Sequence, residues 1–503
     1  MTAEIFCIIN VRISDMKKYI TAALAYAMII SSLCACAPAK TELPEKYSLI
    51  EEGRVTEPKN QRKTGMCAAF SSVNICESAL ITDGLVKADD IDLSEGHTFY
   101  YLYSFMDEKD SSATEDTIYL SGSRKTSLNM MFNAGANPAN ILNMYANGAG
   151  PADESVVDFN TDDMRQSSLN IDNAHNSGAI QKFMGEYLVT GINSYGPSGA
   201  GEFYECSSAD EIKQAIISDG AMLVGMLVDP NVYNVYDGGM SYHHQKKTDD
   251  SKIAVNHATT IIGWDDNFPA ENFGAVKPES NGAWLIQDSQ GADIGTNGCY
   301  WISYEEALCG FVTVDLCARS DYGDILYYDS LTMTEKISSK KGDTVVSNVF
   351  SADNACTLKA VGVQTAAKDQ PLLIEIYRNP EKDVPDSGEC VAVKKATIEN
   401  AGYHVIDLDS TVSFESGDSF SVVITYKDGK SELMGSVPVE GEVDRNLDFF
   451  FVPIECSYTS QKGESYVLHD GMWHDTSNPA TAEIFGLDVT LNNFGIKALM
   501  EKE

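Results

Sequence analysis

Two separated segments of this 503-residue chain have the residue types needed for nucleophilic catalysis. Cys67 lies near the start of the stretch 65–80, where apolar or small residues recur every three to four positions, as in a helix with one buried face. Free backbone N–H groups and the helix dipole at such a start favour a thiolate over a thiol. His257 directly precedes an apolar, β-prone stretch, 258–264. We therefore predict that Cys67 is a nucleophile and that His257 is the base that activates it.

Three segments, 61–71, 256–264 and 282–291, occur in the order and with the internal spacing that resemble the papain family of cysteine peptidases. In the first, a Gln lies six residues and a Gly two residues before the Cys. The resemblance implies that Gln61 donates its side-chain amide to an oxyanion, together with the backbone N–H of Cys67. It also implies that Asp288, at the position of the family's Asn, orients the His257 imidazole.

The family's two Trp positions differ in this chain. Gln290 stands where a Trp would shield the bond to the catalytic His, and Ala68 stands where a Trp would follow the nucleophile. We therefore expect a partly hydrated Asp288–His257 hydrogen bond, which the charge of the carboxylate strengthens. The alternative function is a catalytically weak papain-fold homologue that acts as a glycan- or protein-binding module at the cell surface.

The resemblance also implies a cleft for an extended peptide. Segment 132–137 is similar to the family's Gly-rich loop, so Gly135 and Ala136 are expected to bind substrate, together with Gly65 and Asn256. The cysteines show no short CxxC pairs of the kind found in zinc sites, and we expect neither a metal nor a cofactor. No disulfide pairing can be derived from cysteine spacing in a chain of this length.

Composition restricts the partners and divides the chain. Lys and Arg number 36 against 74 Asp and Glu, a formal net charge of -38, which disfavours nucleic acid and anionic lipid. We predict an α+β, two-lobed papain-like domain over 50–318, with a helical lobe and a β-barrel-like lobe. After it, short β-prone runs between turns predict an all-β sandwich over 324–500. This second domain looks like the lectin-like domain of some exported bacterial family members.

The N-terminal residues have the features of a targeting segment. A basic start at Lys17 and Lys18 is followed by an apolar stretch, shorter than the roughly 20 residues that span a bilayer. Residues 33–36 resemble a bacterial lipobox, which implies a signal segment over 1–36, lipid attachment at Cys36 and a linker over 37–49. A plain secretory signal cut after Ala37 or Ala39 is the alternative.

These features together predict an extracytoplasmic protein that is held to the membrane only by its lipid anchor, or secreted if it is not lipidated. Its expected partners are a peptide or protein substrate and a glycan or cell-wall ligand of the second domain. We expect a monomer.

Overall fold

The computed structural model describes residues 42–105, 116–120, 128, 130–156, 163–197, 204–244, 253, 255–339, 342–441 and 454–502. The predicted signal segment, Cys36 and the first part of the predicted linker lie outside these ranges. Within them, no helix is long and apolar enough to cross a bilayer.

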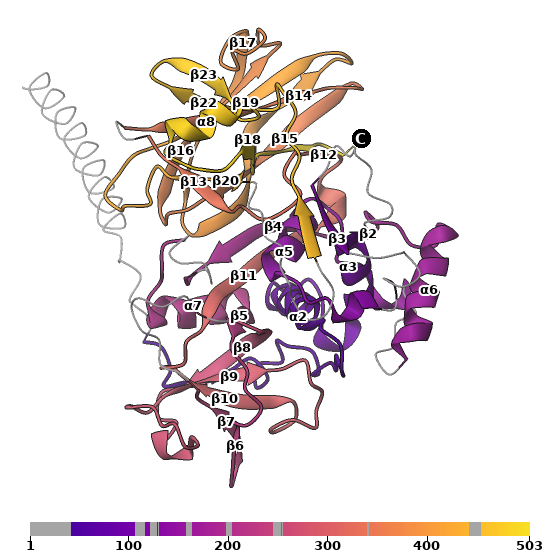
Figure 1. The fold of residues 1–503 in the computed structure, drawn as a ribbon, viewed down its shortest axis with the longest axis vertical. Helices are drawn as coiled ribbons and strands as arrows, with labels where there is room; N and C mark the ends of the chain where they lie inside the picture. Colours follow the sequence, from indigo (N-terminus) through magenta and orange to yellow (C-terminus); the bar gives the residue numbers. More distant parts are fainter. Residues whose placement is uncertain are drawn as a thin grey trace, which may run out of the picture. The chain divides into compact units, whose positions relative to one another are not determined.

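The helical lobe is built around α2 (Cys67–Thr82), which contacts α3 (Glu95–Leu102) and α5 (Pro138–Ala146) (Figure 1). α6 (Met164–Asn176) packs outside α3. The expected helix is present, but the expectation of a single buried face is wrong. Small Ala and Ser side chains allow neighbours to approach α2 from every side, and residues 68–80 are buried apart from Asn74. The lobe also holds the short 3-10 turns Ala88–Asp90, Met131–Asn133 and Glu154–Val156.

The strand lobe follows in sequence and begins with β4 (Tyr187–Ser194) and α7 (Ala209–Asp219). Ser208 and Glu211 form a capping box at the start of α7. The strands that carry the candidate site are β5 (Met222–Met226), β8 (His257–Asp265), β9 (Ala283–Gln287) and β10 (Cys299–Ser303), paired in that order. Beside them lie β1 (Lys46–Ser48), β6 (Asn234–Tyr236), β7 (Gly239–Tyr242) and β11 (Cys309–Ala318).

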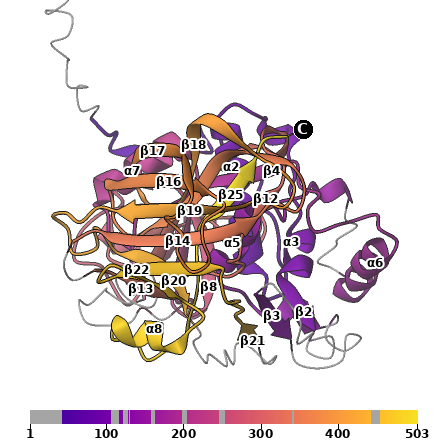
Figure 2. The same ribbon diagram turned by 90° about the horizontal axis from the view of Figure 1, so that it is seen from above.

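The C-terminal part is rich in strands, as predicted. One sheet has the order β17 (Glu389–Ile398), β16 (Gln370–Arg378), β19 (Ser419–Tyr426), β14 (Thr344–Ser351), β22 (Ser465–His469) and β23 (Met472–Asp475) (Figure 2). Its inward side chains share an apolar core with β15 (Cys356–Thr365), β18 (Ala401–Phe414) and β25 (Lys497–Met500). Other elements of this part are β12 (Ile325–Leu326), β13 (Glu335–Ile337), β20 (Val437–Gly441), α8 (Pro479–Ile484) and β24 (Leu491–Phe494).

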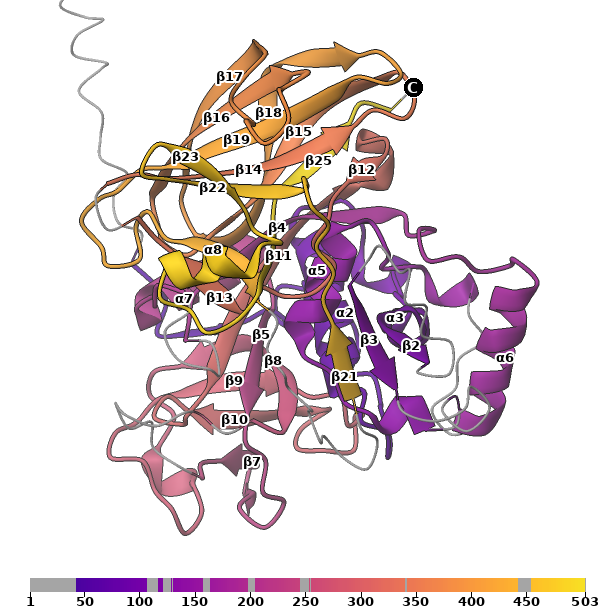
Figure 3. The same ribbon diagram turned by 45° about the horizontal axis from the view of Figure 1, so that its top comes forward.

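Among the described residues, strand pairing joins the C-terminal part to the first 318 residues in two places. β18 pairs with β4, Ala401 opposite Ser194, so one sheet runs from the strand lobe into the C-terminal part. In addition, β21 (Ile454–Ser457) pairs with β3 (Thr117–Leu120), which pairs with β2 (Tyr103–Phe105) of the helical lobe (Figure 3). Neither pairing was predicted, because no local pattern in these segments specifies its partner.

Candidate active site

Three elements bring together the predicted nucleophile, base and orienting residue. Cys67 is the first residue of α2 and His257 is the first residue of β8. β9 pairs with β8, Thr260 opposite Gln287, so Asp288 at the end of β9 lies beside the His257 side chain. His257 Nε2 donates to Asp288 Oδ1 over 2.9 Å. This bond leaves Nδ1 of the imidazole for the hydrogen bond between His257 and the Cys67 sulfur.

The pKa values of Cys67 and His257, which would exchange a proton, are both shifted in favour of the charged form of the side chain. Burial alone would raise the pKa of Cys67, but the hydrogen bond and charge of His257 and the backbone N–H of Ala258 lower it below its ordinary value. Burial alone would lower the pKa of His257, but the Asp288 carboxylate and the Cys67 sulfur raise it well above its ordinary value. Both shifts favour a thiolate–imidazolium pair over a neutral thiol and imidazole.

Asp288 is an ionised carboxyl inside the protein, with 1% of its surface exposed. Its Oδ2 accepts from the Tyr300 hydroxyl over 2.9 Å and its Oδ1 from the Ser289 N–H over 2.7 Å. Burial would raise the pKa of Asp288, but the His257 charge and these donors lower it. The Tyr233 hydroxyl in turn donates to Tyr300 over 3.3 Å.

The expectation of a partly hydrated Asp288–His257 bond is wrong. Both side chains are buried, His257 at 8% exposed. Tyr300 and Tyr233, whose rings pack edge to face, close the carboxylate off on the side away from His257. Gln290 stands at the family's Trp position, but the Asp288 carboxylate is still shielded from water because Tyr300 lies against it and Tyr233 packs on Tyr300. The position of Tyr300 depends on the register of β10 on β9, which puts Tyr300 opposite Ile286.

Gln61 is held beside the same loop. The segment 59–61 pairs with 289–291 through Gln61 N–H to Ser289 O at 2.7 Å and Gly291 N–H to Lys59 O at 3.0 Å. The Gln61 side-chain oxygen accepts from the Ser289 hydroxyl over 2.5 Å, and its Nε2 donates to Thr64 O over 2.7 Å. An amide nitrogen carries two hydrogens, so the second remains for an oxyanion. The sequence interpretation included Ser289 in the third segment, 282–291, but assigned it no role in holding Gln61.

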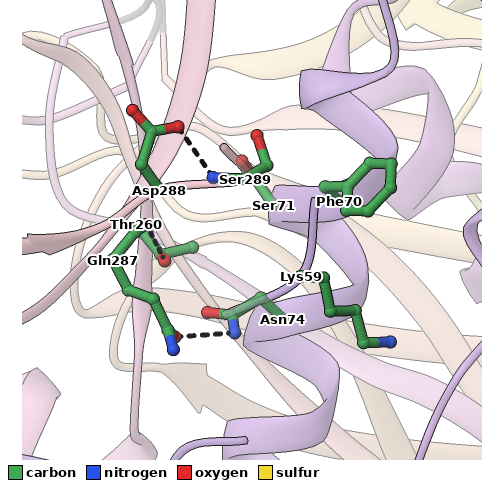
Figure 4. A pocket seen from close by; sticks show the side chains of 8 residues that line it. All are labelled: Lys59, Phe70, Ser71, Asn74, Thr260, Gln287, Asp288 and Ser289. Carbon is green, nitrogen blue, oxygen red and sulfur yellow. Dashed lines mark hydrogen bonds between the residues drawn. The ribbon is translucent and has the colours of Figure 1, made fainter. Parts of the chain in front are cut away.

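A small cavity of about 20 Å³ lies behind the site, between α2 and β9 (Figure 4). Asn74 Nδ2 donates to Gln287 Oε1 across it over 2.9 Å. Its volume suits roughly one water molecule, so it is a packing feature and not a substrate cleft. Its lining residues are Lys59, Phe70, Ser71, Asn74, Thr260, Gln287, Asp288 and Ser289.

The Lys59 ammonium, which lines this cavity, forms ion pairs with Glu77 at 2.8 Å, Asp92 at 2.7 Å and Glu95 at 3.0 Å. These buried and half-buried pairs attach the segment that carries Gln61 to α2 and to the start of α3.

The predicted substrate loop packs directly against the residues before Cys67. Gly65 N–H donates to Phe132 O over 2.6 Å, and a Cβ at Gly65 would lie 3.0 Å from Asn133 O and 3.1 Å from Gly135 N. Only glycine permits this approach without displacement of the loop. Gly135 has a φ of 69°, which also favours glycine, and Ala136 after it is half-buried.

Asn256 has its side chain engaged within the protein. Its Oδ1 accepts from Val228 N–H over 2.7 Å, and its Nδ2 donates to Val228 O over 3.0 Å. The side chain therefore fixes the loop before His257, and contact between Asn256 and substrate remains a prediction for its main chain.

In the part of the chain that the structure describes, no group of three or more His, Cys, Asp or Glu side chains is arranged to bind a metal ion. His243 instead pairs with Glu306 through Nδ1 at 2.9 Å, and both side chains are buried.

Comparison with protein families matches residues 187–318 to the papain family cysteine protease model and residues 325–499 to the lectin like domain model. The chain carries a papain-family cysteine protease domain followed by a lectin-like domain. The predicted fold class, papain-like α+β followed by a β-rich domain, is thereby confirmed. His257 and Asp288 lie within the matched protease segment, whereas Cys67 and Gln61 precede it.

Two solved structures show the same arrangement of domains. A clostridial cysteine protease, Cwp84, after propeptide cleavage is 21% identical with a TM-score of 0.66, covering 91% of this chain and 99% of that chain. The cysteine protease and lectin-like domains of Cwp84, a surface layer associated protein of Clostridium difficile, are also 21% identical. That match has a TM-score of 0.64 and covers 92% of this chain and 90% of that chain. No curated protein sequence gives a significant match.

Proposed function

We propose that the protease domain hydrolyses peptide bonds with Cys67 as nucleophile, His257 as base and acid, and Asp288 as the residue that orients His257. One observation carries this proposal: the hydrogen-bonded series from Cys67 through His257 to Asp288, in which the pKa of the thiol is lowered and that of the imidazole is raised. A Cys in an apolar core has a raised thiol pKa, as buried Cys76 in the same helix does.

The chemistry follows from these groups. The Cys67 thiolate attacks the peptide carbonyl carbon, and the oxygen that becomes negative is stabilised by the Cys67 N–H and the remaining Gln61 N–H. The His257 imidazolium gives its proton to the departing amine, which leaves a thioester on Cys67. The neutral imidazole then takes a proton from water, the hydroxide displaces the thiolate, and the carboxylic acid product is released.

The substrate is an extended peptide whose backbone lies along Gly135 and Ala136, beside Gly65. Gly65 and Gly135 carry no side chain that would stand between the loop backbone and a peptide, which supports main-chain pairing there. Main-chain hydrogen bonds depend little on the side chains of the peptide, so we expect the enzyme to accept many different residues at this position of the substrate.

The protein acts outside the cytoplasm, attached through a lipid on Cys36, and the lectin-like domain holds it near a glycan or cell-wall ligand. Support comes from the lipobox-like segment 33–36 and from the lectin-like domain over 325–499. The similar protein Cwp84 is described as surface layer associated, which agrees with this location.

Peptide hydrolysis by purified wild-type protein and its Cys67→Ala variant tests the enzymatic proposal. We expect kcat/KM on a fluorogenic peptide pool to fall by at least about a thousandfold in the variant, since the covalent route is lost. Cys390→Ala, which removes an exposed thiol of the lectin-like domain, is the matched control and should keep full activity. A wild-type protein that neither cleaves peptides nor reacts with a thiolate-trapping epoxide would make the domain a binding module instead.

A further inference from the structure

A strand of the lectin-like domain lies in the helical lobe of the protease. Residues 454–457 of β21 pair antiparallel with 117–120 of β3, and β3 pairs parallel with β2 (Figures 1 and 3). Ile118 is opposite Cys456 on one side and Tyr103 on the other. Directly opposed residues project to the same face of a sheet, so these three side chains form one row.

Tyr103, at the protease end of this row, contacts the predicted substrate loop. Its hydroxyl donates to the carbonyl oxygen of Gly135. The ring is 6% exposed and packs edge to face on Phe99, with 5.3 Å between the ring centroids. Burial and the nearby Cys456 and Cys67 sulfurs raise the pKa of Tyr103, so the hydroxyl stays protonated and remains a donor at every working pH.

The lectin-like end of the row is fixed by Asp116, the residue before β3. Asp116 Oδ1 accepts from Thr459 N–H over 2.5 Å, and its Oδ2 accepts from Ser330 N–H over 3.1 Å. Thr459 O in turn accepts from Asn493 Nδ2 over 2.9 Å. The segment that continues β21 is thus held both by the protease and by its own domain.

We propose that Tyr103 is a positioning residue for the Gly135 carbonyl and that β21 of the lectin-like domain supports it. A carbonyl oxygen has two lone pairs, so Tyr103 can occupy one from inside the lobe while a substrate N–H uses the other. The lectin-like domain is in this way part of the peptide-binding cleft as well as a ligand-binding module. The inference rests on the proposed peptidase function, because it assigns Gly135 to the substrate.

Steady-state kinetics of Tyr103→Phe test the proposal. We expect KM to rise about five- to tenfold on a peptide long enough to pair with Gly135, because the loop loses a buried hydrogen bond. The value of kcat should stay within about twofold, and the pH profile of Cys67 alkylation should not move. On a short substrate that ends before Gly135, KM should be unchanged.

Tyr426→Phe is the matched control, because it removes a buried hydroxyl that donates to Gln364 O over 2.8 Å within the lectin-like domain. It should change neither KM nor kcat. Cys456→Ala shortens the lectin-like end of the row and should raise KM two- to threefold on the long peptide alone.

Equal KM values for wild type and Tyr103→Phe on both peptides would overturn the role of Tyr103. An unchanged KM in Cys456→Ala would overturn the role of β21. A wild-type protein without hydrolysis would instead show that the proposed function fails.

Discussion

Two carboxyl groups of this protein are similarly buried, but their pKa values are shifted in opposite directions. Asp288 in the active site is 1% exposed and Glu440, where the lectin-like domain meets the protease, is 0% exposed. The partners of Asp288 are an imidazolium, a hydroxyl and a backbone N–H, which lower its pKa. Glu440 is hydrogen-bonded to a second carboxyl, Asp116, and burial and that neighbour raise its pKa well above the ordinary value.

The contrast shows that the partner, and not the depth of burial, decides whether a buried carboxyl keeps its charge. A charged Asp288 stabilises an imidazolium, which catalysis requires. A protonated Glu440 can donate to Asp116 and accept from Leu331 N–H at 3.3 Å, which joins segments of both domains without an uncompensated charge. Lys497 lies close by but is paired with Asp329.

Replacement of Asp288 by Asn should give the largest effect. The amide keeps the hydrogen bond to His257 but not the charge, so we expect kcat/KM near neutral pH to fall about 10- to 100-fold. The alkaline limb of the pH profile should move to lower pH because the imidazolium is less stable. Asp293→Asn, an exposed substitution in the same loop, is the control. Full activity with an unmoved profile would mean that the carboxylate charge has no role.

Replacement of Glu440 by Gln should change stability and leave catalysis intact. The pKa of Glu440 is higher in the folded protein than in the unfolded chain, so Glu440 stabilises the fold at about pH 4.5 and below. This stabilisation is lost as the pH rises through the folded-state pKa. Gln reproduces the protonated form at every pH. We therefore expect equal urea stability for the two proteins near pH 5 and a variant more stable by at least about 1 kcal/mol at pH 8.

The exposed substitution Glu432→Gln should show no such divergence with pH. A Glu440→Gln protein that is less stable than wild type at pH 8 would indicate an ionised Glu440 and would remove the contrast with Asp288.

Replacement of Tyr300 by Phe should give the smallest effect. Asp288 loses one of its donors, so its pKa rises, although His257 and Ser289 still favour the charged form. We expect less than a threefold loss of kcat/KM at pH 7, and a larger loss at acid pH as the acid limb moves upward. An equal loss at all pH values would point to disturbed packing around Tyr300 instead.

Local sequence patterns predicted the elements on which the site is built. The helix after Gly65 and the strand after His257 were found from periodicity and motif, because each depends on neighbouring residues. The shielding of Asp288 by Tyr300 was missed, because it depends on how β10 aligns with β9.

Longer-range features were also missed. The pairing of β21 with β3 joins residues more than three hundred positions apart, and nothing in either segment specifies the other. The burial of α2 on every side was missed, because small residues such as Ala68 do not show from sequence how many neighbours will surround them.

The thiolate–imidazolium pair between Cys67 and His257 can be tested by the pH dependence of Cys67 alkylation. With mass-spectrometric readout of the iodoacetamide adduct, the wild-type rate at pH 6 should be within about tenfold of the rate at pH 8, since the thiolate persists far below ~8.5. The exposed Cys390 is an internal reference in the same protein. Partial burial and Glu375 raise its pKa, so its alkylation rate should increase at the pH of an ordinary thiol or at a higher pH. In His257→Ala the profile of Cys67 should become that of an ordinary thiol. If the alkylation rate of wild-type Cys67 instead increases with a midpoint near the pKa of an unperturbed thiol, the thiolate–imidazolium pair is contradicted.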